Sequence, residues 1–439
     1  MKRLISLILS LSLALSLFLS LAACGKSDGR DDGIMPTKAE LAESIEKPTD
    51  SLARVCDYLV FWGIEPFHRS KLISLESLYA QRFSGELPKT DEMAKTTAEY
   101  FLEYFYDEID LTDSTAVTDA LITCYVAATG DPYSAYRTAD QHVDYETDMS
   151  GSFVGVGITV QYINYQILVI TVYDDSPAER AGIREGDIIV AVDGVSVEEL
   201  GYEQAIDNVR GEEGTNVTVT VLRGGERVDC VATRAPITEI SVSYELTSDR
   251  IGYIRITSFK ANTDEQFTEA INYMESNGAI AIIFDLRSNG GGYIRTATNM
   301  VDRLIPAGVN IISFGSYAQP IKTESERSIS VPIAILTNEY TASAAEIFVA
   351  ALRDYSSEEM GKLIDCTIVG ATTFGKGVAQ STFPFTDNSS VTLTVSHFYS
   401  PLGKSHNSVG IEPDIEVSLG EEGDSQYERA YSELLGKCE

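Results

Sequence analysis

The spacing of apolar residues changes along this chain and divides it into regions of different secondary structure. From about residue 38 to residue 129, apolar residues recur three and four positions apart, as at Tyr100-Phe101 and Tyr104-Phe105. This spacing is typical of amphipathic helices. Asp131-Pro132-Tyr133 ends the pattern, because proline cannot continue a helix. We expect residues 38–150 to form a helical amino-terminal region whose aromatic stripes lie in a core or on a dimer face.

Short strand-like runs separated by turn residues follow over residues 151–234. Ile167 to Val172 is one such run, and Ile188 to Val192 is a second that ends at an Asp-Gly turn. Short runs bounded by glycine and aspartate are typical of β-strands. Tyr202 to Val209 suits a helix. The pattern predicts a small β-rich domain over residues 151–234.

Beyond residue 235, strand-like and helix-like segments alternate. The expected order is strand, helix, strand, helix over Ile251 to Ile256, Phe267 to Met274, Ala279 to Leu286 and Arg295 to Leu304. Such alternation predicts an α/β layer around a mainly parallel sheet. We therefore expect an α/β core over residues 235–420, followed by an acidic carboxy-terminal tail over 421–439 with a closing helix from Gln426.

The charge of the chain restricts its partners. The 439 residues include 33 Lys and Arg against 66 Asp and Glu, which gives a net charge of −33. A surface this acidic repels polyanions and argues against nucleic acid or anionic lipid as the main partner.

The first residues have the pattern of a targeting segment. Lys2-Arg3 precedes an uncharged apolar stretch, Leu4 to Leu21, and small residues then lead into Cys24. This resembles a bacterial lipoprotein signal, in which cleavage leaves the cysteine to carry lipid. We expect a signal peptide over 1–23, a flexible tether over 24–37, and an extracytoplasmic protein that is lipid-anchored to the bacterial cell membrane. An ordinary signal peptide or an uncleaved anchor is the alternative.

The remaining cysteines and the histidines indicate no metal site. No cysteine lies in a C-x-x-C pair, and no His/Glu spacing is typical of a metal site. The cysteines after Cys24 are Cys56, Cys124, Cys230, Cys366 and Cys438. We expect mostly buried thiols, no metal and no organic cofactor.

Ser343 is the first candidate for catalysis. It follows a buried-strand pattern, Ile333 to Leu336, and precedes a helix-like stretch, so its hydroxyl would lie at a helix amino terminus. Free N–H groups at such a terminus favour negative charge, and the N–H of Ala344 could donate to an oxyanion. The alternative is that Ser343 and Glu346 form a capping box and the serine only caps the helix.

Lys376 and Gln380 are four positions apart in a stretch rich in glycine and valine. A serine hydroxyl needs a base, and a lysine can be that base only when neutral, a state that burial favours. If the stretch is extended, both side chains lie on one face, and Gln380 could orient the lysine amine. The alternative is a surface lysine in a glycine turn.

The loop Asp285-Leu-Arg-Ser-Asn-Gly-Gly-Gly292 follows an apolar strand. Glycine-rich loops expose N–H groups to anions, so a phosphate loop is a rival interpretation. No Gly-Lys-Ser/Thr ending is present, and a second oxyanion donor, the N–H of Gly291, fits better. A tight turn is the simplest alternative.

Together these segments resemble the C-terminal processing peptidases, or tail-specific proteases. The motifs lie in order at Gly130 to Ser134, at 285–292, at 341–346, at 374–380 and at Gly410 to Asp414, with a PDZ-like pattern between residues 151 and 234. Departures occur at Tyr340-Thr341, Ala345 and Gly290, where the family usually has Gly-Ser, serine and proline.

The resemblance implies a fold and a set of site residues. It implies a helical amino-terminal region, an inserted PDZ domain and a protease core of the crotonase-like ββα type. Ser343 would be the nucleophile, Lys376 the general base and Gln380 its orienting residue. The implied oxyanion donors are the N–H groups of Gly291 and Ala344. The residues expected to hold a peptide carboxylate are Gly155, Val156, Gly157 and Ile158.

The resemblance also implies an activity. We expect a serine endopeptidase that cleaves extracytoplasmic proteins at or near unstructured C-terminal tails, which the PDZ domain recognises. The helical region could form a homodimer. The alternative is a catalytically silent PDZ scaffold that binds peptides on the same fold.

Overall fold

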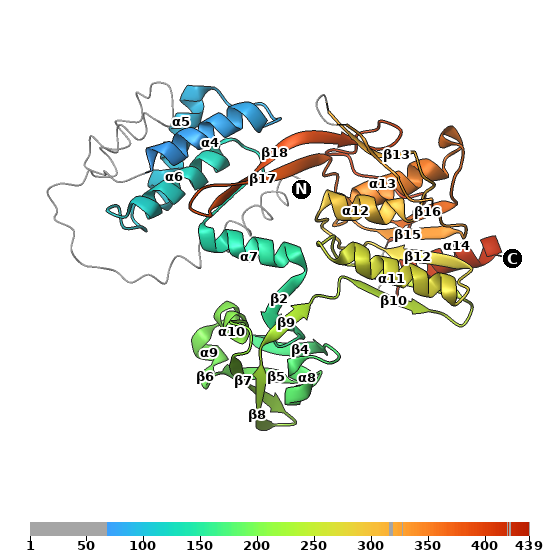
Figure 1. The fold of residues 1–439 in the computed structure, drawn as a ribbon, viewed down its shortest axis with the longest axis horizontal. Coiled ribbons are helices and arrows are strands. Elements are labelled where there is room, and N and C mark those ends of the chain that lie inside the picture. Colours follow the sequence, from blue (N-terminus) through green and yellow to red (C-terminus); the bar gives the residue numbers. More distant parts are fainter. Residues whose placement is uncertain (1–67, 316–318, 327, 419, 421–422, 439) are drawn as a thin grey trace. The chain divides into compact units, whose positions relative to one another are not determined.

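The computed structural model describes residues 68–438 except 316–318, 327, 419 and 421–422 (Figure 1). The expected signal peptide, Cys24 and the tether lie outside these residues. Contacts divide the chain into two units. The first comprises residues up to Val143 together with Phe314–Tyr317 and Val378–Phe398, and the second comprises Asp144–Ser313, Ala318–Gly377 and Tyr399–Glu439.

The described part of the first unit contains three helices and three strands that share a core. They are α4 (Arg69–Arg82), α5 (Thr90–Tyr104), α6 (Ser114–Ala128), β1 (Ala135–Arg137), β17 (Val378–Pro384) and β18 (Ser390–Tyr399). β18 pairs antiparallel with both β1 and β17. The Asp113 carboxylate caps α6 by accepting from two N–H groups of its first turn. As expected, α6 ends before the proline at 132.

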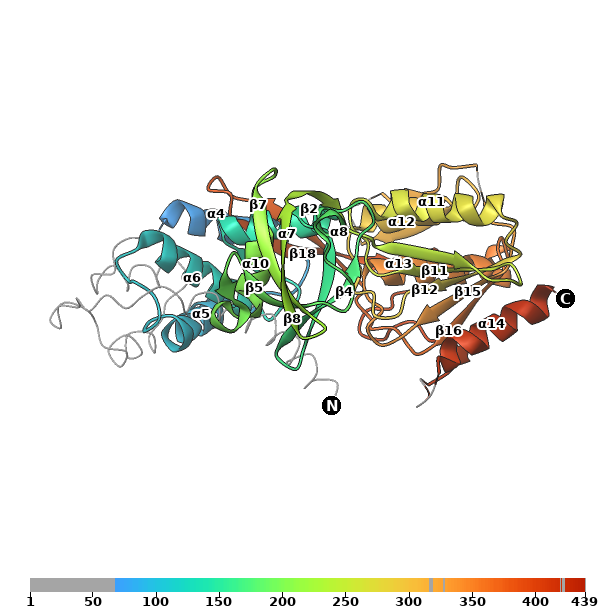
Figure 2. The same cartoon turned by 90° about the horizontal axis from the view of Figure 1, so that it is seen from below.

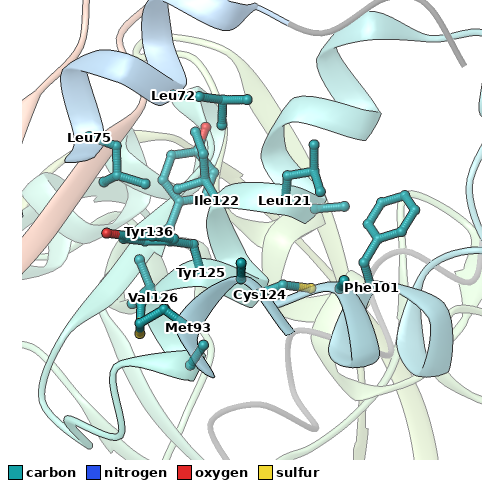
Figure 3. Packing of buried hydrophobic residues seen from close by; sticks show 14 of the residues in the cluster. Leu72, Leu75, Met93, Phe101, Leu121, Ile122, Cys124, Tyr125, Val126 and Tyr136 are labelled. Carbon is teal, nitrogen blue, oxygen red and sulfur yellow. The ribbon is translucent and has the colours of Figure 1, made fainter. Parts of the chain in front are cut away.

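The helices of the first unit share one apolar core (Figure 3). Phe101 of the expected aromatic stripe is fully buried there, and Leu75 and Leu121 of the other two helices belong to the same cluster. Val391 and Leu393 of β18 belong to the same core, which explains why a hairpin late in the sequence groups with the early helices. Most of the stripe is therefore core, although Tyr104 is exposed.

The β-rich domain begins the second unit. Its sheet has the strand order β3-β4-β5-β7-β8, all antiparallel. These strands are β3 (Ile158–Ile163), β4 (Gln166–Val172), β5 (Ile188–Val192), β7 (Asn216–Arg223) and β8 (Glu226–Thr233), with the short β6 (Val195–Ser196) beside β5. The helices are α8 (Pro177–Ala181), α9 (Val197–Leu200) and α10 (Tyr202–Val209). β2 (Ser152–Gly155) pairs with β9 (Ala235–Thr238) where the chain enters and leaves the domain.

A mainly parallel sheet forms the α/β core. Its order is β10-β11-β12-β15-β16-β19, and only the β10–β11 pair is antiparallel. The strands are β10 (Val242–Leu246), β11 (Ile251–Ile256), β12 (Ala281–Asp285), β15 (Ile333–Thr337), β16 (Cys366–Gly370) and β19 (Ile415–Glu416). The remaining short elements are β13 (Asn310–Phe314), β14 (Ile321–Lys322), η1 (Glu358–Met360) and α7 (Ala139–Ser150), which joins the two units in sequence.

Helices cover both faces of this sheet (Figure 2). The helices are α11 (Thr263–Ser276), α12 (Ile294–Asp302), α13 (Ala344–Ser356) and α14 (Ser425–Cys438). Phe267 of α11 and Phe348 of α13 contact Phe284 of β12 through ring edges and tilted faces. On the other face, Ala430 and Leu434 of α14 are fully buried against the strands. The expected acidic tail is thus largely a helix that completes the core, because its apolar residues recur on one side.

Candidate active site

Parallel strand pairing brings the predicted catalytic segments to one edge of the sheet. β12, β15 and β16 are adjacent and parallel, with Asp285 opposite Leu336 and Leu336 opposite Val369. The loops after these three strands contain Gly291, Ser343 and Lys376, respectively. Loops at the carboxyl ends of adjacent parallel strands converge, which explains how distant segments meet.

Ser343 has an unusual backbone conformation at the start of α13. It is the N-cap residue, with φ 58° and ψ −118°. Positive φ costs a non-glycine residue about 1–3 kcal/mol and persists only where surrounding contacts hold it. The Ala342 N–H donates to the Asn289 carbonyl at 2.9 Å, and the Ser343 N–H donates to Glu346 Oε2 at 2.9 Å. The expected capping box is present, and the positive φ of Ser343 is a strain that helix capping by itself does not require.

The glycine loop packs directly on the serine. Gly291 has φ 104°, and a Cβ added there would lie 2.8 Å from Ser343 Cβ and 2.9 Å from the Ala344 nitrogen. Only glycine therefore fits between the loop and the helix start. The buried Ala344 N–H has no hydrogen-bond partner within the described part of the chain, as an oxyanion donor requires.

The second expected donor is engaged. The Gly291 N–H donates to Asn289 Oδ1 at 2.9 Å. The Asn289 amide is buried and donates to the Ile256 carbonyl at 2.9 Å. Asn289 thus fixes the glycine loop to β11 and, through its own carbonyl, to the serine segment. Sequence reasoning missed this residue, although asparagine two positions before a loop glycine is a known turn signal.

Glu346 connects the serine and lysine segments. Its Oε2 accepts from the N–H groups of Ser343 at 2.9 Å and Lys376 at 2.8 Å. Its Oε1 accepts from Thr373 Oγ1 at 2.5 Å and from the Gly375 N–H at 2.7 Å. The side chain is fully buried, so four donors offset its loss of water. Sequence reasoning gave Glu346 only a capping role.

Lys376 lies in a packed segment and not in an exposed turn. A Cβ on Gly375 would lie 2.7 Å from the Gly410 nitrogen, and one on Gly377 would lie 2.8 Å from the Asn407 nitrogen. The two glycines therefore permit close backbone packing on both sides of the lysine. Lys376 is half-buried, which argues against the alternative of a surface lysine.

The segment from Lys376 to Gln380 is not one regular strand. β17 begins only at Val378, and its pairing with β18 shifts between Ala379 and Gln380. The extra residue of this bulge is Val395 of β18, so the bulge does not interrupt the alternation of side chains along β17. Because Lys376 precedes the strand, the shared face of Lys376 and Gln380 stays a prediction. Gln380 belongs to the first unit, where its amide donates to Thr394 Oγ1 at 3.3 Å. Its role in orienting Lys376 stays a prediction.

The expected carboxylate-binding residues lie where β2 passes into β3. Gly155 still pairs with Ala235 of β9. The buried Val156 accepts a hydrogen bond from the Ala178 N–H at 2.8 Å. A Cβ on Gly157, which has φ 83°, would lie 2.5 Å from Ser176 Cβ, so glycine is required. Ile158 begins β3, and in the described residues β3 pairs only with β4.

An ion-pair network connects the start of the glycine loop to the start of helix α14. Arg287 donates to both carboxylate oxygens of the fully buried Asp285 and to both oxygens of Asp424 at the start of α14. Hydrogen bonds from Arg287 are the main cause that lowers the pKa of Asp424. Helix α14 and the glycine loop are therefore joined through one guanidinium.

Other expected features can be located as well. Cys124, Cys230 and Cys366 are buried free thiols, and Cys438 is exposed. Among the residues that the structure describes, no group of three His, Cys, Asp or Glu side chains could hold a metal ion. No helix in the same residues is long and apolar enough to span a membrane.

Comparison with known proteins tests the resemblance seen in the motifs. The model of peptidase family S41 matches residues 250–417, and a PDZ domain model matches residues 168–223. The carboxy-terminal processing protease CtpA of Bacillus subtilis is 33% identical over 335 residues, which cover 75% of this chain and 69% of that protein. This chain belongs to peptidase family S41 and is CtpA-like. The expected family and the expected fold class are confirmed.

Further relatives agree with this assignment to family S41. A protein of Staphylococcus aureus named probable CtpA-like serine protease is 34% identical over 343 residues, covering 77% of this chain and 67% of that protein. A solved structure from Bacteroides fragilis, described as an S41 protease candidate, has a TM-score of 0.52 at 18% identity and covers 83% of this chain and 97% of that one. The latter supports the fold alone. The β-rich domain of this CtpA-like protease is therefore its PDZ domain, and the α/β layer is its peptidase core.

Proposed function

We propose that this protein is a serine endopeptidase that cuts extracytoplasmic polypeptides at or near their C-terminal tails with a Ser–Lys mechanism. Ser343 Oγ attacks the scissile carbonyl carbon while neutral Lys376 Nζ takes the hydroxyl proton. The Ala344 N–H stabilises the oxyanion, and the Gly291 N–H joins it when it turns from Asn289 Oδ1 to the substrate oxygen. The lysine returns its proton to the leaving amine, and water then hydrolyses the acyl-enzyme.

The observation that carries this proposal is the strained Ser343 backbone beside the Ala344 N–H, which has no hydrogen-bond partner among the residues that the structure describes. The backbone N–H of Lys376 donates to the same Glu346 oxygen as the N–H of Ser343. If Ser343 only capped the helix, its strained backbone would destabilise the fold without contributing to function. The arrangement supports a nucleophile, an oxyanion donor and a base segment held together before substrate arrives.

The PDZ domain supports recognition of a free C-terminus. Peptides bind PDZ domains as an added strand, with the terminal carboxylate on N–H groups before the edge strand. Here Val156, Gly157 and Ile158 precede and begin an edge strand. We expect these N–H groups to hold the carboxylate of the substrate tail.

Cleavage of an unfolded protein with an apolar C-terminus tests the catalytic proposal. The chain from Gly25 onward should cleave it, and the Ser343→Ala variant should lose at least about a thousandfold in rate, as when other catalytic serines are removed. Equal cleavage by both proteins would rule out the Ser343 mechanism. No cleavage by either, with peptide binding retained, would favour the alternative of a silent PDZ scaffold.

Lipid attachment at Cys24 places the protein outside the cytoplasm on the cell membrane. The support is the sequence pattern of a basic start, an apolar stretch and small residues before the cysteine. Mass spectrometry of the purified full-length protein should find lipid on an amino-terminal Cys24. A Cys24→Ala variant should instead keep the signal peptide or leave the membrane fraction. An unlipidated Cys24 in the native protein would contradict the anchor.

The homodimer stays a separate expectation, which light scattering of the soluble chain tests.

A further inference from the structure

The free edge of β3 continues past the expected carboxylate site into a group of three tyrosines. Tyr162 of β3 contacts Tyr165 of the β3–β4 turn, with ring centroids 6.4 Å apart and nearly perpendicular planes. It also contacts Tyr202, the first residue of α10, with centroids 5.0 Å apart. We call Tyr162, Tyr165 and Tyr202 the tyrosine cluster. Tyr165 is 89% exposed and Tyr162 is 47% exposed, so these two rings do little for the domain core, whereas Tyr202 is half-buried and packs against that core.

The turn that carries Tyr165 is unfavourable for a tyrosine. Asn164 and Tyr165 have φ 51° and 63°, the left-handed values that a tight two-residue hairpin turn requires. Glycine is the favoured second residue, and a side chain there costs about 1–2 kcal/mol. A bulky residue in a strained position, with its ring in solvent, indicates a role in binding rather than in stability.

The register along β3 assigns a substrate position to the cluster. Ile158 and Val160 pack against the domain core, and Tyr162 is the next residue of this alternation. A tail that adds antiparallel to β3, with its carboxylate before Ile158, runs toward Tyr162. The C-terminal residue of the tail then lies beside Ile158. The residue two positions before the C-terminal residue lies beside Val160, and the residue four positions before it lies beside Tyr162.

Charge around the cluster indicates which side chain it accepts. Residues 197–209, which contain α9 and α10, carry four exposed carboxylates and no basic residue. These are Glu198, Glu199, Glu203 and Asp207. Residues 158–172 of the β3–β4 hairpin carry no charge. Aromatic faces attract cations, and nearby carboxylates add to this attraction.

We propose that the tyrosine cluster selects substrate tails with Lys or Arg four residues before the C-terminal residue. This selection rests on the proposed function, because it uses the carboxylate site to set the register. The tail is held at one end by backbone N–H groups and four residues upstream by the three aromatic rings. Tails with Asp or Glu at that position are repelled by the carboxylates of α9 and α10.

Peptide binding to the Ser343→Ala form of the chain from Gly25 onward tests this selection. The probes are fluorescent decapeptides with a common apolar end and Lys, Leu or Glu at the fifth position from the C-terminus. Fluorescence anisotropy should show that the Lys peptide binds about 2–5-fold more tightly than the Leu peptide, the range expected for an exposed cation–π contact. The Glu peptide should bind more weakly than both.

Two further variants identify the cluster as the cause. Tyr165→Gly removes one ring and improves the turn, so reduced selection cannot come from a damaged fold. Tyr202→Ala removes a second ring. Both should reduce the Lys/Glu ratio toward one, whereas Val231→Ser on β8, an exposed control at the opposite edge of the sheet, should leave it unchanged.

The outcomes separate the two proposals. If a C-terminal amide binds as well as the free acid, or no peptide binds, the carboxylate site fails and this selection fails with it. If the free acid is required but the Lys, Leu and Glu peptides bind equally, only the tyrosine cluster is wrong. A Lys preference that survives Tyr165→Gly and Tyr202→Ala also overturns it.

Discussion

The backbone N–H groups of Ser343 and Lys376 donate to the same atom, Oε2 of Glu346, at 2.9 and 2.8 Å. Because both bonds end on one oxygen, the two backbone nitrogens lie within about 6 Å of each other. The carboxylate is fully buried, where hydrogen bonds to charge are strong. Glu346 thus fixes the relative position of the backbone at the proposed nucleophile, Ser343, and at the proposed base, Lys376.

Replacing Glu346 with glutamine should reduce catalysis more than substrate binding. In Glu346→Gln an NH2 group replaces one carboxylate oxygen. It would face donors that bond to that oxygen in the wild type, so buried N–H groups would be left unpaired. We expect kcat to fall at least about a hundredfold with KM little changed, since misplacement near 1 Å has such effects. Steady-state kinetics on the folded variant measures this split.

Asp354→Asn is the matched control for that experiment. Asp354 is a buried carboxylate on the same helix, bonded to Arg353 and to the Leu402 N–H but to neither catalytic segment. It should lower thermal stability while kcat of the folded protein is kept. An equal loss of kcat in both variants would mean that Glu346 acts only through general stability.

Adjacent glycines in the loop after β12 should differ sharply in their tolerance of a methyl group. Gly291→Ala places Cβ 2.8 Å from Ser343 Cβ and from the Ala342 carbonyl oxygen, at a φ of 104°. Gly290→Ala meets no atom within 4 Å and requires no left-handed backbone. We expect the first variant to lose more than about 90% of peptidase activity, because the loop must leave the serine. The second should stay within about twofold of wild type. Similar activity in the two variants would contradict the close packing of Gly291 against Ser343.

The order of strands and helices in the core could be predicted from the sequence because it depends on local periodicity. Tyr202 to Val209 and Ile251 to Ile256 match α10 and β11 to the residue. Parallel strands then required the loops with Gly291 and Ser343 to converge.

Other features depend on contacts between distant residues and left no local signal. The local sequence predicts only a capping role for Glu346. Its bonds to Thr373 and Gly375 form only when β15 and β16 pair. The extra residue of β18, Val395, is apparent only from the register between β17 and β18. The place of β17 and β18 in the first unit depends on Val391 and Leu393, whose apolar partners are the early helices.

Exchanging Arg287 for lysine should loosen the glycine loop and α14 together. Lysine keeps the charge but cannot make the paired bonds that the guanidinium makes to Asp285 and Asp424. Because Asp285 is fully buried, we expect a loss of about 2–4 kcal/mol in unfolding free energy. Asp424→Asn should cost about 1 kcal/mol or less, since that carboxylate is 42% exposed. Hydrogen exchange should become faster in α14 in the Arg287 variant. Unchanged exchange there would show that the link carries no stability.

A buried lysine joins the helices of the first unit to the β17–β18 hairpin. Lys71 Nζ lies 2.8 Å from Asp387 Oδ2, 3.1 Å from Asp119 Oδ1 and 2.6 Å from the Tyr136 hydroxyl. Partial burial alone would raise the pKa of Asp387, but hydrogen bonds from Lys71 and Ser389 outweigh it and lower the pKa to about 2. Asp387 therefore favours the folded state only when it is ionised.

The stabilising effect of Asp387 should disappear in acid. A carboxyl whose folded pKa lies below its unfolded value contributes fully above about pH 4, and this contribution is lost as the pH falls toward 2. Asp387 is 46% exposed, so after allowance for solvent screening Asp387→Asn should cost only about 1 kcal/mol near pH 6. Hydrogen exchange in α4 and β18, corrected for the intrinsic effect of pH, should show this difference at pH 6 and a smaller one at pH 3. Glu99→Gln, which removes an exposed pair with Lys95, should change exchange little at either pH. A difference between wild type and Asp387→Asn that grows in acid would contradict the assigned direction of the pKa shift.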